Sequence, residues 1–578
     1  MSIPVTITRI DVPSKLRKLH KNKLANRLLN ARGVESAEEL KFALADLPRP
    51  DTLLGIEAAV DRLLAARTEQ QKVLIVGDYD CDGATSTCLA LLALRAMGFK
   101  HVEYLVPNRF DYGYGLSPAI VDVAAKSKPD LIVTVDNGVA SVDGVERATE
   151  LNIDVVVTDH HLPPAVLPRA VALVNPNIPG ATFPSGNLAG VGVCFYVLLA
   201  LRARLAKEGI DGGDVKLADY LDLVAIGTVA DVVPLDKINR TLVEQGLRRI
   251  RRGYTRPGVL ALLSRAGRVA DRITASDIGF AIGPRLNAAG RLDDMTRGIE
   301  CLLCEDEAES LRLATDLDTL NKQRRSIEQK MREEAETVLA DDELLNTGSD
   351  TSFGLVLFDE NWHQGVIGIV AGRLKEQLNQ PVVVFASDGD EYVKGSARSI
   401  PGVHIRDVLD SVATHNPDLI DKFGGHAMAA GLTLARSRFS EFTDAFNKEV
   451  KRVLNGELPI RELHSDGSLG DADRTLSTAT LIADICPWGQ EFPAPQFDDR
   501  FIVEGSREVG TGHLKLSLRS IPGESDDYGT IYDGIAFNQP NSFANGDTVH
   551  VVYALSVNHF RGSRSLQLQV AHIQISES

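Results

Sequence analysis

The 578-residue sequence predicts a multidomain α/β protein that ends in an all-β domain. Three observations support this prediction. Short apolar segments alternate with amphipathic helical segments between residues 70 and 175, a charged helical stretch covers 305–345, and strand patterns with glycine-rich turns fill the sequence after 459. A single hydrophobic core is excluded at this length, because cores seldom extend beyond about 250–300 residues.

The first block of the sequence, residues 70–175, predicts a parallel sheet with helices on both faces. Helix-like stretches such as Ala84–Met97 and Val142–Leu151 separate its strands. The predicted strands are short and rich in valine and isoleucine: Lys72–Gly77, Val102–Val106, Leu131–Val135, Asp154–Thr158 and Val171–Val174.

The later blocks differ from the first. Apolar residues recur at helical spacing from Glu305 to Leu345 without glycine or proline, which predicts one long helix between two domains. A second, smaller α/β block follows from about 351 to 455. Beyond it, alternation at Leu514, Leu516 and Leu518 predicts the strands of a β-domain.

The overall composition excludes several classes of protein. Apolar residues make up 44% and charged residues 24%, which is typical of globular proteins rather than disordered or fibrous chains. Six cysteines are too few for a disulfide scaffold. The first twenty residues lack the apolar core of a signal peptide, and no run of about 18 apolar residues could span a bilayer. We therefore expect a cytoplasmic protein without membrane segments.

Charge is unevenly distributed along the chain. The sequence has 62 basic and 79 acidic residues, a net charge of -17, which excludes a uniformly basic surface for nucleic acid. Residues 237–299 nevertheless carry thirteen Lys and Arg against five Asp and Glu. Almost all of these bases are arginines, whose planar guanidinium suits phosphate. The stretch therefore predicts either a polyanion-binding track or a solvated helical face.

Acidic residues and histidines follow the carboxyl ends of three predicted strands. Ligands bind beyond these ends in open α/β sheets, so we expect the side chains to converge at one edge. Asp231, which follows an apolar helix-like stretch, is expected to join them. The residues after the three strands are Asp78, Asp80 and Asp82, then Asp136, then Asp159, His160 and His161.

Such a cluster indicates a metal centre. Carboxylates in one crevice repel each other and resist ionisation unless cations neutralise them. Aspartate and histidine without cysteine favour Mn²⁺ or Mg²⁺ over structural zinc. Two such ions about 4 Å apart can activate water and stabilise the oxygens of a phosphoryl displacement. A single aspartate at a strand end more often forms a turn, but turn formation would not gather five aspartates and two histidines.

Four segments resemble the motifs of the DHH phosphoesterase superfamily: Val76–Gly83, Val135–Gly138, Thr158–His161 and Val229–Asp231. Their order, their spacing and the chain length are similar to those of its RecJ family, bacterial single-strand-specific exonucleases. The resemblance implies a single-stranded-DNA-specific 5′-to-3′ exonuclease that releases mononucleotides by two-metal hydrolysis and acts in DNA recombination and repair. The implied cofactors are two Mn²⁺ or Mg²⁺ ions.

The resemblance also implies a domain organisation. A parallel-sheet DHH phosphoesterase domain is followed by a long connecting helix, a smaller α/β DHH-associated domain and an all-β barrel of the oligonucleotide-binding (OB) type. The expected boundaries are an N-terminal extension at 1–50, the catalytic domain at 51–304, the connecting helix at 305–345, the substrate-binding domain at 346–458 and the OB-like single-strand-binding domain at 459–578.

The roles of the metal ligands are carried over from the resemblance residue by residue. Asp80 is implied to bind one metal ion and Asp82 the other, and Asp136 is implied to bridge the two. His160 and Asp231 are implied to complete the shell of the second ion.

Three further residues of the cluster have less specific roles. Asp78 and Asp159 either ligate a metal or hold the ligands in place, and the sequence does not separate these roles. His161 is implied to face the scissile phosphate as donor or proton carrier, which makes it, with Asp159, a candidate catalytic residue. The alternative for His161 is a supporting histidine behind the ligands.

Glycine-rich and arginine-containing segments are the candidates for substrate binding. The segment Phe423–Gly431 predicts a close backbone approach followed by a helix of small residues, whose N-terminus offers N–H groups to an anion. It resembles the glycine-histidine motif of the DHH-associated domain. Together with matches to a terminal-phosphate pocket and to a segment in the basic stretch, the resemblance implies substrate contacts from Gly424, Gly425, His426, Ser396, Arg398, Arg109 and Arg285.

The expected partners follow from the same resemblance. OB-type barrels hold single strands by stacking bases on aromatic side chains and by contacting phosphates with cations. The implied partners are single-stranded DNA, a single-strand-binding protein and a RecQ-type helicase, with no membrane and a monomeric chain.

Two other functions remain as alternatives. A DHH phosphodiesterase of short oligoribonucleotides or cyclic dinucleotides needs only the two catalytic domains, so the additional β-domain argues against it. A non-enzymatic DNA-binding scaffold has no reason to retain mutually repelling carboxylates such as Asp80, Asp82 and Asp136.

Overall fold

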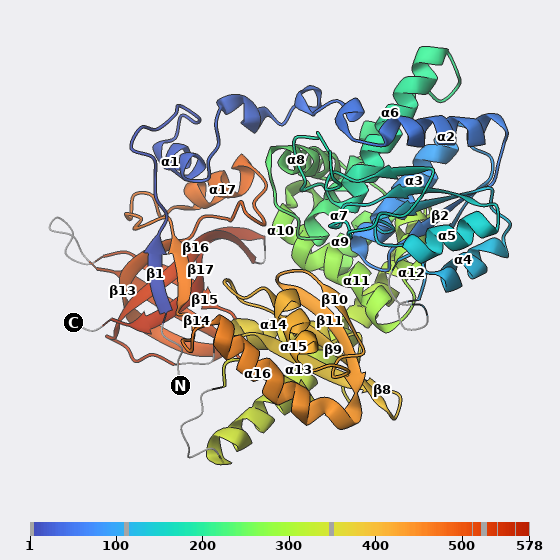
Figure 1. Cartoon of the computed structure of the whole chain (residues 1–578). Coiled ribbons are helices and arrows are strands. Elements are labelled where there is room, and N and C mark those ends of the chain that lie inside the picture. Colours follow the sequence, from blue (N-terminus) through green and yellow to red (C-terminus); the bar gives the residue numbers. More distant parts are fainter. Residues whose placement is uncertain are drawn as a thin grey trace. The chain divides into compact units, whose positions relative to one another are not determined.

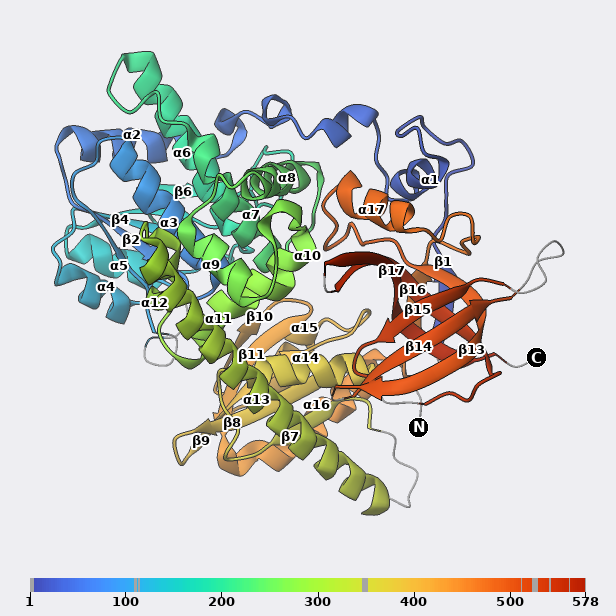
Figure 2. The ribbon, with the colours of Figure 1, turned by 180° about the vertical axis from the view of Figure 1, so that it is seen from behind.

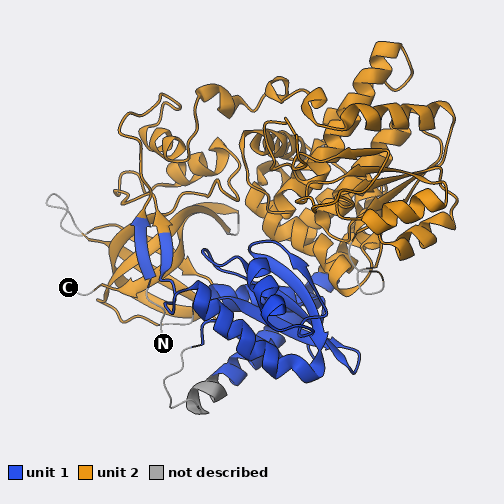
Figure 3. Cartoon of the chain, in the orientation of Figure 1, with its two compact units in different colours: residues 1–8, 319–463 blue, residues 9–318, 464–578 orange. Residues whose placement is uncertain are grey.

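The computed structural model describes residues 5–108, 112, 115–345, 352–510, 512–521, 529–539, 542–560 and 562–576 (Figures 1 and 2). The chain forms two compact units, coloured separately in Figure 3. The larger unit contains residues 9–318 and 464–578, and the smaller unit contains residues 1–8 and 319–463. None of the helices in the described ranges combines the length and apolarity needed to cross a bilayer.

A five-stranded parallel sheet lies at the centre of the larger unit, with the strand order β3-β2-β4-β5-β6. The predicted strands are confirmed to within one residue at either end. Every residue of β2 and β4 is buried, as expected for strands between two helical layers. The strands are β2 (Val73–Gly77), β3 (Val102–Leu105), β4 (Leu131–Val135), β5 (Asp154–Thr158) and β6 (Ala172–Val174).

Helices cover both faces of this sheet, as the sequence predicts (Figure 1). One face packs against α4 (Pro118–Ala125) and α5 (Val142–Glu150), through a core that includes Ile132 and Val155. The other layer contains α2 (Ile56–Thr68), α3 (Cys81–Ala96), α6 (Gly190–Glu208) and α7 (Leu221–Ala230).

Further helices follow α7 in the chain. The long helix predicted between the domains is confirmed as α13 (Glu307–Leu345), whose 39 residues span roughly 60 Å. The division between the two units falls within this helix, after Asp318. The intervening helices are α8 (Lys237–Arg251), α9 (Pro257–Arg265), α10 (Ala275–Asp277), the π-helical turn η6 (Ile278–Ile282), α11 (Gly283–Leu292) and α12 (Thr296–Leu303).

The smaller unit is built on a mixed five-stranded sheet with the order β10-β11-β9-β8-β7. Phe385, Phe442 and Phe446 lie in its core. Its strands are β7 (Leu355–Phe358), β8 (Val382–Asp388), β9 (Tyr392–Arg398), β10 (Lys422–Gly425) and β11 (Ala429–Ala435). Its helices are α14 (Ile367–Leu378), α15 (Ile405–His415) and α16 (Phe439–Val453).

One predicted element of this unit is wrong. The sequence predicts a helix of small residues after Gly424 and Gly425, but β10 and β11 form an antiparallel hairpin there. Ala430, Leu432 and Leu434 are buried while the residues between them are more exposed, and this period of two places them on one face of a strand.

The C-terminal residues form a closed barrel with the order β13-β14-β15-β17-β16, which confirms the predicted all-β barrel. Its core includes Leu24 and Leu28 from α1 (Lys23–Ala31). Outside the barrel, β1 (Val5–Arg9) pairs with β12 (Arg461–Ser465). The barrel elements are α17 (Leu476–Ile485), β13 (Phe497–Val509), β14 (His513–Ser520), β15 (Ile531–Ala536), β16 (Thr548–Phe560) and β17 (Ser563–Ile575).

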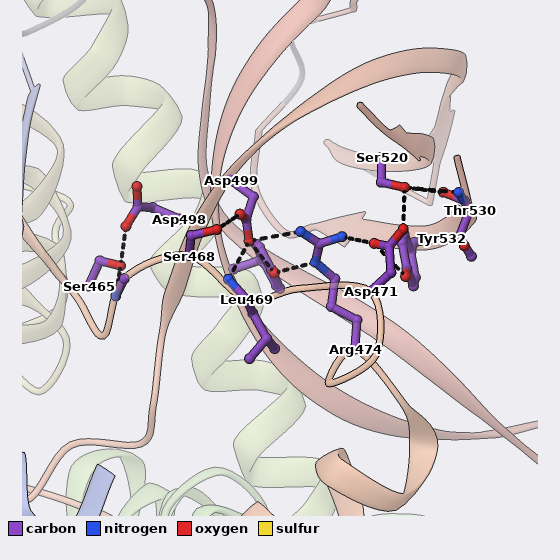
Figure 4. A network of polar contacts seen from close by, with 12 residues as sticks. Ser465, Ser468, Leu469, Asp471, Arg474, Asp498, Asp499, Ser520, Thr530 and Tyr532 are labelled. Carbon is purple, nitrogen blue, oxygen red and sulfur yellow. Dashed lines mark hydrogen bonds and ion pairs between the residues drawn. The ribbon is translucent and has the colours of Figure 1, made fainter. Parts of the chain in front are cut away.

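A buried polar network fixes the segment before α17 to the barrel (Figure 4). The Arg474 guanidinium forms an ion pair with Asp471, and its Nη2 lies 3.2 Å from Asp499 Oδ2. Arg474 Nε donates to Tyr553 Oη at 2.9 Å, and Tyr532 Oη donates to Asp471 Oδ1 at 3.0 Å. Because each buried charge has a charged and a hydroxyl partner, the network satisfies the polar groups that burial would otherwise destabilise.

Candidate metal centre and phosphate pocket

The predicted acidic residues and histidines converge in the larger unit. The strand order reverses between β2 and β4, and ligands bind at such a switch point beyond the carboxyl ends of the strands. Asp78 follows β2, Asp136 follows β4 and His160 follows β5 directly after Asp159. Asp231 caps the end of α7, which packs against α3.

The possible metal ligands form three groups, and within each group the ligand atoms lie within 4.8 Å of one another. Two residues belong to two groups each and so connect all three. His160 Nε2 lies 3.1 Å from Asp136 Oδ1 and 3.5 Å from Asp231 Oδ2. The groups are Asp78 with Asp80 and Asp136, Asp82 with His160 and Asp231, and Asp136 with His160 and His161.

The start of α3 positions two of these carboxylates. Asp80 is the N-cap of the helix, and its Oδ1 accepts hydrogen bonds from Asp82 N at 2.9 Å and Gly83 N at 3.0 Å. This cap holds the Asp80 carboxylate beside Asp78 and Asp136. Capping and metal ligation, which the sequence presents as alternatives, are therefore compatible for Asp80.

The neighbouring helices hold the Asp82 carboxylate. Its oxygens accept hydrogen bonds from Gly190 N at 2.6 Å and Val191 N at 3.0 Å, at the start of α6. A Cβ on Gly190 would lie 2.5 Å from the Asp136 side chain, and one on Gly227 in α7 would lie 2.6 Å from Asp82 Oδ1. The sequence reasoning missed both glycines, although each lies in an apolar helical stretch where glycine is otherwise unfavourable.

Burial and mutual repulsion disfavour the charged forms of these carboxyl groups. Burial, followed by repulsion from neighbouring carboxylates, raises the pKa of Asp82 and of Asp136 well above the usual range. The same causes raise the pKa of Asp231 to about 7. A divalent cation would restore the ionised forms, and a donor set of carboxylate oxygens and imidazole nitrogens fits Mn²⁺ or Mg²⁺.

Asp159 has a different role from the other aspartates. Its Oδ2 accepts a hydrogen bond from Val139 N at 2.8 Å, and its Oδ1 lies 2.7 Å from His161 Nδ1. Burial opposes charge on both partners, but their hydrogen bond outweighs it, so the pKa of Asp159 is lowered and that of His161 is raised to about 9. Among the residues that the structure describes, Asp159 joins none of the three ligand groups and instead orients His161.

Two predicted phosphate-binding residues lie together in the smaller unit. Arg398 Nη1 donates to Ser396 Oγ at 3.0 Å and to the Ala397 carbonyl at 2.8 Å. A Cβ on Gly368 would lie 2.8 Å from the Arg398 guanidinium, so this glycine allows the start of α14 to come close. Burial lowers the pKa of Arg398, and no carboxylate pairs with it in the described part of the chain. A partly buried guanidinium with only uncharged partners is suited to an anionic ligand.

The glycine-histidine segment lies beside this arginine. Ser396 pairs with Gly431 on β11, which in turn pairs with Gly424 on β10. Gly425 has a φ of +145°, and a Cβ there would lie 2.4 Å from the Ala429 carbonyl oxygen. The main-chain N–H of His426 donates to that same carbonyl at 2.8 Å. The glycines therefore allow a tight hairpin turn.

Two other predicted contacts have different outcomes. Arg109 lies outside the described residues. Arg285 is buried, with its Nε 2.9 Å and its Nη2 2.7 Å from Asp318 Oδ1, and its Nη1 donates to the Ala281 carbonyl. These contacts favour a structural role for Arg285, and its contact with substrate stays a prediction.

Comparison with known proteins decides the family. The DHH family, N-terminal domain, matches residues 72–228, the DHHA1 domain matches 351–452 and the RecJ OB domain matches 465–572. A single-stranded-DNA-specific exonuclease RecJ from Dickeya dadantii is 49% identical over 562 residues, which cover 95% of this chain and 96% of that protein.

The chain belongs to the RecJ family. The crystal structure of a RecJ from Thermus thermophilus in complex with Mn²⁺ superposes with a TM-score of 0.77 at 29% identity, over 96% of this chain and 76% of that one. The complex of that RecJ with Mg²⁺ gives a TM-score of 0.71 at 28% identity, over 96% and 75% of the two chains.

The arginine-rich stretch at 237–299 is the region for which the sequence predicts either a polyanion-binding track or a solvated helical face. Several of its arginines are already paired with acidic residues. Arg249 Nη1 lies 3.1 Å from Asp219, and Arg256 Nη1 lies 2.6 Å from the buried Asp222. Both aspartates lie outside residues 237–299. They neutralise arginines of the stretch, so its net positive charge in the folded protein is lower than a count along the sequence gives. The pairing weakens the prediction that the whole stretch is a continuous phosphate track.

Proposed function

We propose that this protein is a single-stranded-DNA-specific exonuclease that degrades strands from the 5′ end and releases mononucleotides, in DNA recombination and repair. The observation that carries the proposal is the cluster of three ligand groups connected through Asp136 and His160. The name of the relative from Dickeya dadantii supports the substrate, and the RecJ complexes with Mn²⁺ and Mg²⁺ support the metals.

The three groups suggest how the chain would hold two divalent ions. Asp136 would contribute to both sites, because it belongs to two groups and lies 3.1 Å from His160. When bound, the ions supply an activated water and stabilise the oxygens of the phosphate. The other residues that would hold the ions are Asp78 and Asp80 for one, and Asp82, His160 and Asp231 for the other.

His161 is the proposed proton carrier. Asp159 holds its Nδ1, and their hydrogen bond favours the protonated imidazole by raising the pKa of His161 to about 9. The ring then presents Nε2 to a phosphate oxygen or to the departing oxygen. Asp159 acts through His161 and is a positioning residue.

The direction of digestion is proposed to come from the smaller unit. Arg398 and Ser396 would hold a terminal 5′ phosphate, because the guanidinium is partly buried and its hydrogen bonds go only to uncharged oxygens. Arg109, Gly424, Gly425 and His426 complete the proposed substrate contacts. A strand held by its 5′ end is hydrolysed from that end.

The wider assignments are proposals of the same kind. We propose the domain boundaries 1–50, 51–304, 305–345, 346–458 and 459–578, which the three matched segments support. We also propose a cytoplasmic monomer that works with a single-strand-binding protein and a RecQ-type helicase.

Digestion of end-labelled strands tests the proposal. With Mn²⁺ present, a 5′ label should leave first as a mononucleotide, while a 3′ label remains on strands that shorten progressively. An RNA strand of the same sequence should not be digested. A chelator should prevent digestion of the DNA strand. Release of the 3′ label first would refute the polarity, and digestion in chelator would refute the metal centre.

A further inference from the structure

An exposed aromatic residue lies on the turn η6, which packs against α7, the helix whose C-cap is Asp231. Phe280 is 73% exposed and forms the middle of η6, the single π-helical turn among the described residues. Ile278 and Ile282 of the same turn are fully buried. Such turns often occur at functional sites, and a phenyl ring that exposed contributes little buried apolar surface to the core.

This turn packs against the end of α7. A Cβ on Gly279 would lie 3.7 Å from the Val229 side chain, and one on Gly283 would lie 3.2 Å from Ala230 Cβ. Asp231, a proposed metal ligand, follows Ala230 directly. The exposed ring therefore extends from a segment that touches the last turn before the ligand.

A second exposed apolar side chain, Val232, lies just after the end of α7, against which η6 packs. Val232 directly follows Asp231, is 62% exposed and has a φ of +64°. A β-branched residue in this left-handed region is strained, and such strain is concentrated at ligand-binding sites. Val232 therefore follows Asp231 in the chain, and Phe280 lies on the turn that packs against the residues just before Asp231.

A cluster of basic side chains lies where the residues just before η6 meet the barrel. Arg272 precedes η6 and its Nη1 lies 3.0 Å from His559 Nδ1 on β16. His559 on β16 is paired in register with Arg564 on β17, so three basic side chains lie close together. Burial, followed by the charges of Arg272 and Arg564, lowers the pKa of His559. Asp271 lies 3.5 Å from Arg272 and offsets part of this charge.

We propose that Phe280 stacks on a nucleobase of the single strand whose phosphate is at the metal centre, and that Arg272, His559 and Arg564 contact phosphates further along that strand. This inference rests on the proposed function and adds a strand path within the larger unit, from the ligands to the barrel. Every base has a π-face, so stacking on one ring would accept any sequence.

Binding measurements with an abasic scan test the stacking. A 5′-phosphorylated strand carries one abasic site at successive positions, and fluorescence anisotropy is measured in chelator. In the wild-type protein, one position near the 5′ end should weaken binding roughly 5- to 150-fold. Phe280→Ala should bind the intact strand more weakly by a similar factor and lose its sensitivity at that position. Phe280→Trp should keep the sensitivity.

The control is another exposed aromatic residue. Tyr392 is 42% exposed at the start of β9 in the smaller unit, and Tyr392→Ala should leave the abasic profile and the digestion rate unchanged. A merely structural role of Phe280 would weaken binding equally at all positions. Such a uniform loss, or unchanged binding by Phe280→Ala, would overturn the stacking.

The cationic part of the path has its own measurement. Replacing Arg272 and Arg564 with Gln should flatten the dependence of log affinity on log salt by about 0.7 for each phosphate that the protein no longer neutralises. An unchanged slope would overturn this part. All binding is measured without metal, so these outcomes do not depend on digestion. The proposed function would fail in a different way, if the wild-type protein bound strands but did not digest them with metal present.

Discussion

His160 Nε2 lies 3.1 Å from Asp136 Oδ1 and 3.5 Å from Asp231 Oδ2, so one imidazole connects a carboxylate after β4 with a carboxylate at the end of α7. The two aspartates are far apart in sequence and come from different elements. Neither would ionise readily in this buried position, since the pKa of each is raised. The arrangement is favourable when cations share these ligands.

The first prediction concerns Asp136. Its φ is +63°, a conformation that Asn tolerates and Ala does not, so Asp136→Asn removes the charge without straining the backbone. We expect hydrolysis to fall by well over ~100-fold, because the proposed centre uses this carboxylate for both ions, and outer-shell changes alone cost about 10–100-fold. Turnover of an end-labelled strand measures the loss. Activity within a few-fold of wild type would contradict a bridging role.

The second prediction concerns stability with and without metal. Saturating Mn²⁺ at about 100 times its Kd should stabilise the fold by about 2.7 kcal/mol for each ion bound, because the proposed site exists only in the folded protein. In chelator, Asp136→Asn should melt at or above the wild-type temperature, since the amide relieves carboxylate repulsion. Thermal melting in Mn²⁺ and in chelator gives both values. A variant that keeps the full Mn²⁺ shift would show that Asp136 is no ligand.

The third prediction concerns the terminal phosphate. Arg398→Gln should remove the preference for a 5′-phosphorylated strand over a 5′-hydroxyl strand, with a loss of roughly 10- to 100-fold on the phosphorylated strand only. Arg373→Gln is the matched control, because Arg373 lies on α14 and pairs with Glu328 and Glu376 at the surface. Competition between the two strands in one reaction measures the preference. Equal losses on both strands would assign Arg398 to the fold instead.

The fourth prediction concerns pH and the barrel. Burial opposes the charge of Asp498, but hydrogen bonds from Arg9, Ser465 and His550 outweigh it and lower its pKa. A lowered pKa in the folded state means that the ionised group stabilises the fold above the unfolded value of about 3.9, and that this contribution is lost as pH falls below it.

Melting of Asp498→Asn between pH 7 and pH 3 tests this. At pH 7 the wild-type protein should melt at a higher temperature than Asp498→Asn. This difference in melting temperature should shrink as the pH falls below about 4. Arg9→Gln should give a smaller difference of the same sign. A difference that grows on acidification would contradict the assignment.

The sheet and the metal cluster could be predicted because both depend on local patterns. A short valine-rich run predicts a buried strand. An aspartate directly after it, as at Asp78 and Asp136, is then expected at the carboxyl edge of the sheet, where ligands bind. The hydrogen bonds from the start of α6 to Asp82 join residues 108 positions apart, and no local pattern encodes them. The ion pair between Arg285 and Asp318 was missed for the same reason.

The wrong helix after Gly425 has a different cause. A run of small residues fits a helix and a strand equally well by composition. Only the alternation of Ala430, Leu432 and Leu434 distinguishes a strand from a helix here. The preceding glycines also fit the start of an anion-binding helix, and this signal points to the wrong element.

The packing of α1 on the barrel has a consequence during synthesis of the chain. Leu24 and Leu28 share a core with barrel strands, and Arg32 pairs with Asp466, 434 residues later. At about 5–20 residues per second, a ribosome needs roughly 20–90 s to reach that partner. Throughout this interval the apolar face of α1 is without its native cover. This first helix can therefore become native only among the last steps of folding, when the barrel closes around the residues made at the beginning.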